Sequence, residues 1–218
     1  MSLLSLPSEL CLYIVYKACT YSKEDLQTLY SLTLISKTFN IFISSHRTSI
    51  VEHYTKIVKN DNCTRWLLCG QRHRDSDLPA VMRLNGSQCW YQHGQKHRDN
   101  NQPAAIYSNG SQFWYQHGQL HRDNDIPAVM WDDGSQFWYY HGQKHRDNDM
   151  PAVIYSNGSQ FWYNCDQLHR DNDMPAVIWA DGTQFWYQHD QIRRDNGLPA
   201  AIYANGTVEY WVNGVKTH

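Results

Sequence analysis

The chain has 218 residues, 41% hydrophobic residues and a formal net charge of −2. This near-neutral charge argues against a globally basic protein that attracts nucleic acid or an anionic membrane surface. The six cysteines show no paired or Cys-x-x-Cys spacing, which is typical of free thiols in a reducing compartment. No signal peptide and no apolar run long enough to span a membrane is recognisable, so we expect a soluble protein of the cytoplasm.

Residues 1–60 have the apolar periodicity of helices and no repeat. Pro7 suits the first turn of a helix, and the leucines and isoleucines that follow keep one face apolar. A second helix is predicted to begin at Ser22 and a third to occupy residues 38–58. We therefore expect a small helical domain over residues 1–60.

The stretch HRDNDMPAVIYSNG, which begins at His145, resembles the catalytic loop of a protein kinase, where His-Arg-Asp is followed by Asn. The same phrase returns every 24 residues, however, beginning at positions 73, 97, 121, 145, 169 and 193. A catalytic loop is needed once, whereas six registered copies indicate a structural repeat. We therefore expect neither an enzyme nor a cofactor.

One repeat, residues 145–168, reads as two strands and two turns. PAVIY opens on a proline, which is tolerated at the start of a strand. Asn157-Gly158 is typical of a two-residue hairpin turn in which both residues have positive φ. SQFWYN then reads as a second aromatic strand, and a His-Gly turn closes most repeats.

Stacked hairpins of this kind bury a continuous aromatic stripe that one hairpin alone cannot bury. The predicted fold class is α+β: a small N-terminal helical module, then an elongated antiparallel β-meander of six 24-residue repeats over residues 66–218.

The acidic or Asn-Gly turn, aromatic strand and polar-Gly turn, as in NGSQFWYQHGQ and DGTQFWYQHDQ, make residues 66–216 similar to MORN-type repeats. The resemblance is to the divergent YwqK-type version, which also occurs in proteins of large DNA viruses. It implies a non-catalytic repeat domain.

The N-terminal segment resembles an F-box, with Leu-Pro-Ser-Glu-Leu at its start and LISKTFN near its end. The resemblance implies docking of a Skp-type adaptor, which links to a cullin and its ubiquitin-transfer machinery. It assigns the apolar docking surface to Leu6, Pro7, Leu10, Ile14 and Leu26. The pairing of F-box and MORN-like repeats implies a viral protein of the host-cell cytoplasm.

Three repeated residue types invite functional interpretations. The invariant arginines could grip a row of anions, but stacking on a neighbouring Trp or bridging to an Asp is the favoured interpretation. The histidines could form a metal array, but hydrogen bonds to turn backbone are favoured, and no metal site is predicted. Protonated stacked histidines would repel one another, so the array is predicted to loosen below about pH 6.

The tryptophans could stack nucleic-acid bases, but core packing is favoured because no basic groove accompanies them.

A partner surface should lie where the repeats differ. Exposed aromatic residues are common in such surfaces. The candidate partner-binding residues are Tyr107, Trp131, Tyr140, Tyr155, Trp179 and Tyr203. The sequence thus favours an adaptor that recruits an unidentified target protein to a cullin-type ubiquitin ligase. The alternative is a structural scaffold whose N-terminal helices cap the sheet.

Overall fold

The computed structural model describes residues 55–68, 70–212 and 214–217. Within these ranges the chain forms strands and turns and no helix, so the α+β class is wrong for them: this part is all-β. The helix predicted over residues 38–58 fails at its end, because residues 55–58 belong to strand β1 (Thr55–Asn60). The sequence TKIVKN contains three β-branched residues, Thr55, Ile57 and Val58, which favour a strand. The remainder of the predicted helical module lies outside the described residues.

The chain divides into two compact units. Unit 1 includes the described residues up to Asn85 together with Trp90–Gln95, and unit 2 includes Gly86–Cys89 and the residues from Lys96 onwards. In unit 1, β2 pairs with β1, β3 and β4. The strands of unit 1 after β1 are β2 (Cys63–Leu68), β3 (Gln71–Arg72), β4 (Val81–Arg83) and β6 (Tyr91–Gln92); β7 (Gln95–Lys96) spans the change of unit.

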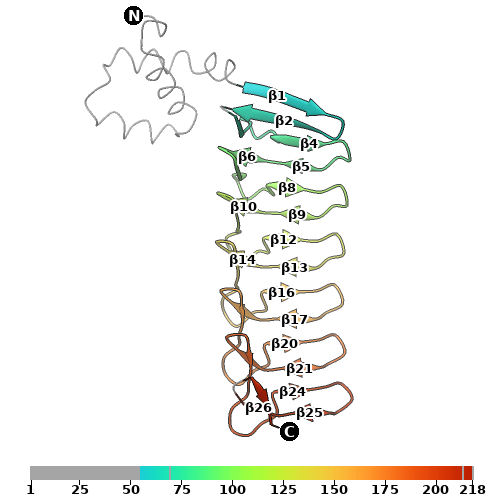
Figure 1. Ribbon diagram of the computed structural model, residues 1–218, viewed down its shortest axis with the longest axis vertical. Helices are drawn as coiled ribbons and strands as arrows, with labels where there is room; N and C mark the ends of the chain where they lie inside the picture. The colour runs from blue at the N-terminus through green and yellow to red at the C-terminus, as the bar shows by residue number, and fades with distance from the viewer. Residues whose placement is uncertain (1–54, 69, 213, 218) are drawn as a thin grey trace, which may run out of the picture. The chain divides into compact units, whose positions relative to one another are not determined.

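Unit 2 is built on a long antiparallel sheet in which two strands come from each repeat (Figure 1). This confirms the predicted meander of 24-residue hairpin repeats. The strands of this main sheet, in spatial order, are β5 (Gln88–Cys89), β8 (Ala105–Ile106), β9 (Gln112–Phe113), β12 (Val129–Met130), β13 (Gln136–Phe137), β16 (Val153–Ile154), β17 (Gln160–Phe161), β20 (Val177–Ile178), β21 (Gln184–Phe185), β24 (Ala201–Ile202) and β25 (Val208–Glu209).

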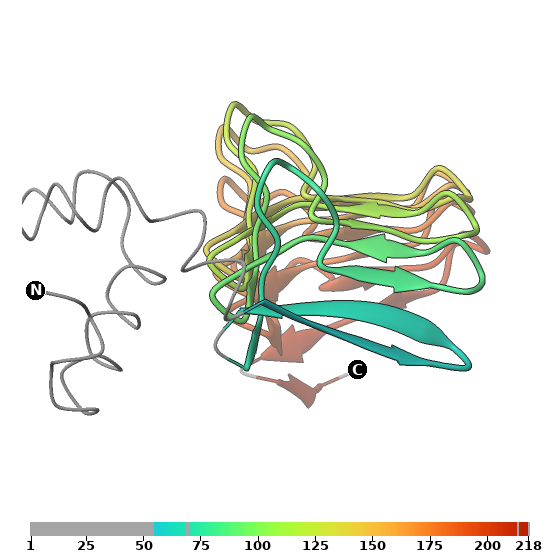
Figure 2. The ribbon, with the colours of Figure 1, turned by 90° about the horizontal axis from the view of Figure 1, so that it is seen from above.

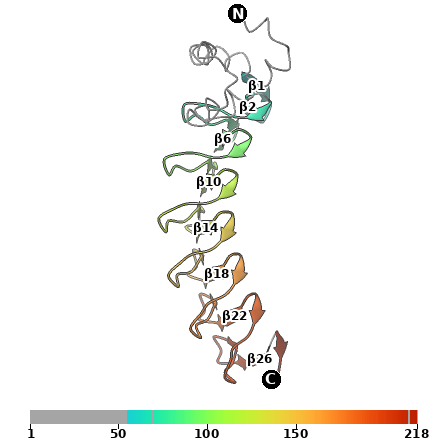
Figure 3. The ribbon, with the colours of Figure 1, turned by 90° about the vertical axis from the view of Figure 1, so that its left-hand side faces the viewer.

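A second row of small hairpins runs beside the main sheet of unit 2 (Figure 3). Seen from above, the repeats of unit 2 overlay one another, with the main strands on one side and the second hairpins on the other (Figure 2). The second hairpins are β10 (Tyr115–Gln116) with β11 (Gln119–Leu120), β14 (Tyr139–Tyr140) with β15 (Gln143–Lys144), β18 (Tyr163–Asn164) with β19 (Gln167–Leu168), β22 (Tyr187–Gln188) with β23 (Gln191–Ile192), and β26 (Trp211–Val212) with β27 (Val215–Lys216).

The predicted strand over residues 159–164 is therefore two strands, separated at Trp162. The Trp162 N–H donates to the Ala176 carbonyl of the next repeat, at 2.9 Å or less, whereas its own carbonyl accepts from the N–H of His169 in the second hairpin. One residue thus serves two ladders, and the chain turns a corner there. Four short strands per repeat replace the two that were predicted.

The Asn-Gly turn also differs from the prediction. Of Asn157 and Gly158 only the glycine has a positive φ, of 90°. The Gly158 N–H donates to the Tyr155 carbonyl and the Tyr155 N–H to the Ser159 carbonyl, both at 2.9 Å, which is a type I turn followed by a glycine bulge. The Asn157 side chain accepts from the Ser159 N–H at 2.9 Å, so its role is to cap the turn.

Two-residue turns with two positive φ values occur instead at the other corners. In the second hairpin, His117 and Gly118 have φ of 47° and 83°. At the turn near the start of repeat 145–168, Asn148 and Asp149 have φ of 61° and 53°. Asn and Asp adopt this left-handed region more readily than other residues with a side chain, which explains their recurrence here.

The buried residues form columns rather than a closed core. The main sheet is one layer, and burial comes from the corner where it meets the second hairpins. Each Trp side chain at this corner is 5–6% exposed, and its indole N–H donates to a turn carbonyl 13 residues earlier. The alanines that accept from the Trp backbone are fully buried: Ala80, Ala128, Ala152, Ala176 and Ala200.

Among the described residues, no helix could span a membrane.

The buried alanine column leaves no room for a larger side chain. We expect Ala152→Leu to lower the free energy of unfolding by about 1–3 kcal/mol, because overpacking forces the Trp138 corner apart. The matched control is Ala180→Leu at an exposed turn position, which should change it by less than about 0.5 kcal/mol. Urea unfolding followed by tryptophan fluorescence measures both, and equal losses would contradict the packing described here.

Candidate functional site

The repeated arginine joins each repeat to the one before it. The Arg146 guanidinium carbon lies 3.8 Å from the centre of the Trp138 ring. Its Nε and Nη2 donate to the two carboxylate oxygens of Asp125, at 2.6 and 2.9 Å, and Nη1 donates to the Pro151 carbonyl at 3.4 Å. The Arg146 side chain is only 10% exposed. This confirms stacking on Trp and bridging to Asp as the role of the arginine.

We call this arrangement of Trp, Arg and the turn acidic residue the latch. It recurs in unit 2 with Asn101 in place of the aspartate at Arg122. Hydrogen bonding from the arginine lowers the pKa of each latch aspartate below its ordinary value. Because these guanidiniums already have carboxylate partners, they do not form a row for an external anion. The complete latches are Trp138–Arg146–Asp125, Trp162–Arg170–Asp149 and Trp186–Arg194–Asp173.

The repeated histidines serve the turns. His97 Nδ1 accepts from the His117 backbone N–H at 3.2 Å, and Nε2 lies 2.9 Å from Asp99 Oδ1. Nδ1 must therefore be unprotonated, so Nε2 carries the hydrogen. The two imidazoles stack with ring centres 4.5 Å apart. Hydrogen bonding to turn backbone is confirmed for His73, His97 and His121, whereas Nδ1 of His145 and of His169 is buried without a hydrogen-bond partner. The described residues hold no group of three or more potential metal ligands.

A second junction between repeats was missed from the sequence. The hydroxyl of Ser135, which is 2% exposed, accepts from the Ser156 N–H of the next repeat at 3.0 Å. Ser159 accepts in the same way from the Ala180 N–H. The signal was a Ser or Thr directly after the turn glycine in every repeat. The arginine and serine contacts thus fix consecutive repeats to each other, and the sheet that they hold together is the platform for the remaining residues.

The residues left for function lie on one face of that platform. Seven aromatic rings follow one another across the main sheet, each packed against the next edge to face with ring centres 5.1–6.2 Å apart. We call this row the aromatic ladder. Its members are Tyr107, Phe113, Trp131, Phe137, Tyr155, Phe161 and Trp179, and Phe185 with Tyr203 forms a further pair.

The ladder includes buried side chains between its rings and remains open above. Val153 pairs with Phe137 on one side and with Phe161 on the other, so the three side chains project from the same face of the sheet, and Val153 is 2% exposed. Trp131 and Tyr155 are each 40% exposed, and Trp179 is 43% exposed. Large rings that remain this exposed in a contiguous row are typical of an interaction surface.

Of the six candidate partner-binding residues, four belong to the aromatic ladder, Tyr203 belongs to the further pair with Phe185, and Tyr140 belongs to neither. Tyr140 lies in a second hairpin, where its ring contacts His121 and His141 at 5.1 and 4.4 Å, and it is 55% exposed. The phenylalanines of the ladder were missed, because this position is Phe in all four internal repeats and variation was the criterion used to choose candidates.

The second hairpins contribute tyrosines beside the ladder. Burial raises the pKa of Tyr139 and of Tyr163, and for both the Tyr155 hydroxyl contributes to the rise. The Tyr139 and Tyr163 hydroxyls therefore remain neutral donors at physiological pH. They give the apolar ladder a polar margin. The candidate adaptor-binding residues Leu6, Pro7, Leu10, Ile14 and Leu26 lie outside the described residues.

The latch predicts that lysine cannot replace its arginine. Arg146→Lys removes the flat stacking and the paired hydrogen bonds, and should lower the free energy of unfolding by about 1–3 kcal/mol. The control is Arg193→Lys, whose 38% exposed side chain bonds the Asp195 carboxylate two residues later. We expect a change below about 0.5 kcal/mol there. A tolerated Arg146→Lys would show that the latch contributes little.

The histidine pair of unit 1 predicts a loss of stability in acid. Burial, and then the charge of His73, lower the pKa of His93 below its ordinary value of about 6.5, against an opposing effect of Asp75. The unfolded chain then binds more protons as the pH falls through 6.5, so stability decreases below that pH. Protection of the His93 amide from hydrogen exchange should fall between pH 7.5 and 5.5.

The substitution His93→Asn, which tolerates the positive φ of 47°, should weaken this pH dependence. Protection that is identical in the parent and the variant at both pH values would contradict the assignment to His93. Protection at pH 7.5 serves as the control for an intact turn.

Comparisons with known proteins give no assignment: no family model matches the chain, and no curated protein and no solved structure is significantly similar to it.

Proposed function

We propose that this chain is a non-catalytic binding protein whose aromatic ladder recognises a partner protein. The observation that carries the proposal is the row of exposed rings held edge to face on a rigid sheet. Because neighbouring rings restrict each other's rotamers, binding costs less side-chain entropy than it would for isolated exposed aromatics. Tyr and Trp also supply large contact areas with few rotatable bonds.

A protein is a better partner for this face than a nucleic acid. Bases do stack on exposed rings, but affinity for single strands also needs cations along the backbone. The latch guanidiniums are instead committed to aspartates of the same chain. The tyrosine hydroxyls beside the ladder suit the mixed apolar and polar surface of a protein.

The sequence resemblances extend the proposal to a pathway. The F-box-like segment would dock a Skp-type adaptor through Leu6, Pro7, Leu10, Ile14 and Leu26. The MORN-like repeats would then present their bound target to a cullin-type ubiquitin ligase. In this proposal the protein acts in the cytoplasm, and in that of the host cell if it is viral.

A structural scaffold is the second candidate, and the uniformity of the junctions favours it. The arginine latch and the serine hydroxyl bond recur from repeat to repeat with distances that differ by a few tenths of an ångström. Such regular spacing suits a rod that carries load or assembles. Ordered self-association at micromolar concentration, measured by sedimentation, would support the scaffold over the adaptor.

The proposed docking of a Skp-type adaptor is tested by co-purification of the full chain with such an adaptor. We expect the parent to bind and the Leu6→Ala, Pro7→Ala double variant to lose binding, because the apolar contact is truncated. Tryptophan fluorescence of both proteins confirms that the repeats remain folded. A folded parent that does not bind would overturn the proposed adaptor docking. It would not affect the proposed binding of a partner by the aromatic ladder.

The proposed binding of a target protein by the aromatic ladder is tested by quantitative affinity purification with the Trp131→Ala, Trp179→Ala double variant. Partners enriched by the parent should be reduced at least about tenfold, since each truncated anchor typically costs 1 kcal/mol or more. Met150→Ala is the matched control, since Met150 is 43% exposed and lies in a turn outside the ladder. Partners retained by the ladder variant and lost by the control would overturn the proposal.

A further inference from the structure

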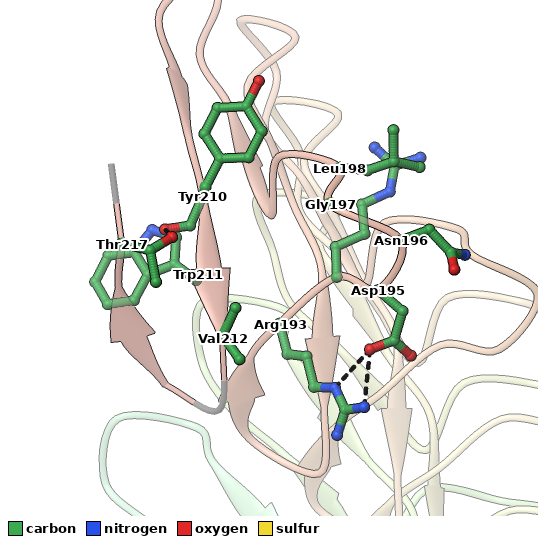
Figure 4. A pocket seen from close by; sticks show the side chains of 10 residues that line it. Arg193, Asp195, Asn196, Gly197, Leu198, Tyr210, Trp211, Val212 and Thr217 are labelled. Carbon is green, nitrogen blue, oxygen red and sulfur yellow. Dashed lines mark hydrogen bonds and ion pairs between the residues drawn. The ribbon is translucent and has the colours of Figure 1, made fainter.

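The polar groups of the pocket in the last repeat are bonded within the chain. This pocket has a volume of about 680 Å³ and is drawn in Figure 4. Its carboxylate, Asp195, accepts from Arg193 at 2.9 and 2.8 Å. The Tyr210 carbonyl accepts from the Thr217 N–H at 2.9 Å. The aromatic ladder, by contrast, has polar groups and charges that are available to a ligand.

The larger rings of the ladder recur at a fixed spacing along the stack. Trp131, Tyr155 and Trp179 directly follow β12, β16 and β20, which are every second strand of the main sheet. Neighbouring strands lie about 4.7–4.9 Å apart, so successive large rings are offset by about 9.4–9.8 Å. The repeats overlay one another in Figure 2, so these rings form one row across the strands. A peptide that contacts all of them must repeat at this distance.

The polyproline II helix is a peptide conformation with this period. Its three residues per turn rise by 3.1 Å each, which gives about 9.3 Å per turn. Over the two intervals from Trp131 to Trp179 the mismatch is therefore about 1 Å or less. An α-helix returns to the same face after seven residues, or about 10.5 Å, and so drifts by about 2 Å over the same distance. Side chains on one face of a strand recur every 6.6–6.8 Å or so, which does not match the rings.

The ladder also has hydrogen-bond donors for such a segment. A polyproline II helix has no internal hydrogen bonds, so its carbonyls accept from the surface on which it lies. The indole N–H of the corner residue Trp138 donates to a turn carbonyl at 3.1 Å. The indole N–H groups of Trp131 and Trp179 have no hydrogen-bond partner within the described part of the chain. Each can therefore donate to a backbone carbonyl of a segment on the row.

The turns beside the two Trp rings are acidic. Asp133 shares a turn with Trp131, and Asp181 shares one with Trp179, whereas Asn takes this place in the turn after Tyr155. A backbone hydrogen bond from the residue after the turn glycine lowers the pKa of each aspartate, so both are charged at neutral pH. Both are exposed, and neither has a cationic partner in the described ranges. A cation at either place would meet a carboxylate and the face of an indole.

We propose that the aromatic ladder binds a proline-rich polyproline II segment of a partner protein, which runs along the stack with one helical turn per repeat. Prolines pack on the rings, and basic residues six positions apart lie at the Trp131 and Trp179 turns, two repeats apart. The chain does not contain such a segment itself, because its seven prolines lie at least 24 residues apart. This inference rests on the proposed function and names the class of partner that the ladder recognises.

The probe is a fluorescent peptide, PPRPPPPPRPP, and its anisotropy is measured with the full chain. We expect saturable binding. The peptide PPPRPPPRPPP has the same composition, but its arginines face different sides of the helix, so it should bind at least about fivefold more weakly. The peptide GSRGSGSGRGS keeps the spacing of the arginines in a flexible chain. It should bind at least about tenfold more weakly, because it is not preorganised.

The charge contacts are tested with turn variants that keep the fold. Asp133→Asn with Asp181→Asn retains the side-chain oxygen that caps each turn, as Asn157 does in its own repeat. This double variant should weaken binding of the first peptide about fivefold, because two exposed ion pairs are lost. The matched control is Asp147→Asn with Asp171→Asn, which removes the same charge at corner turns and should leave binding unchanged.

The ring contacts are tested with Trp131→Ala and Trp179→Ala together, which should weaken binding of the first peptide at least about tenfold. Three outcomes would overturn the proposal: no binding by the folded parent, equal binding of the two proline-rich peptides, or unchanged binding by this variant. The proposed function fails separately. If affinity purification still yields partners that depend on the two Trp rings, the ladder binds a protein, and only the polyproline II segment is excluded.

Discussion

The structure depends on a guanidinium held between an indole ring and a carboxylate. In water each of these contacts alone would contribute little, because an exposed ion pair is screened and solvated. Here Arg146 is 10% exposed, and the flat group meets Trp138 on its face and Asp125 at its edge. Both partners belong to the preceding repeat, so the interaction joins repeats to one another. A single-layer sheet of two-residue strands has little apolar burial of its own, and this junction compensates for that lack.

The same junction determines which residues remain available for function. Arginines, histidines and buried serines are committed to the corners, and the tryptophans at position 162 and its equivalents are buried. The aromatic ladder is therefore a contiguous row of aromatic groups that stay partly exposed on the main sheet. Its rings are fixed by their neighbours on adjacent strands, so the flat face is ordered before any partner arrives. Within each 24-residue repeat, the residues of the binding surface and the residues of the buried columns occupy different positions.

Features that follow from the 24-residue period were predicted from the sequence. Features that depend on the local hydrogen-bond geometry were missed. The 24-residue period and the role of the arginines followed from registered copies. The break at Trp162 could not be read, because SQFWYN has the composition of one continuous strand and the corner arises from hydrogen bonds to two different ladders. Asn157-Gly158 is compatible with two turn types, and the cap on the Ser159 N–H selects the type I form. At the ladder, Tyr155 was selected because its position alternates between Tyr and Trp, whereas Phe161, whose position is Phe in all four internal repeats, was overlooked.

The strict 24-residue register has a consequence for how such a protein can change in length. The hydrogen bonds of the latch aspartates and of the buried serines link residues 21 positions apart, in neighbouring copies. Removing or duplicating one internal copy would therefore join identical chain ends and restore identical bonds. The surface would become shorter or longer by one Phe and one Tyr or Trp. The number of copies thus sets the length of the aromatic face, and this length could match partners of different size without any change within the repeat.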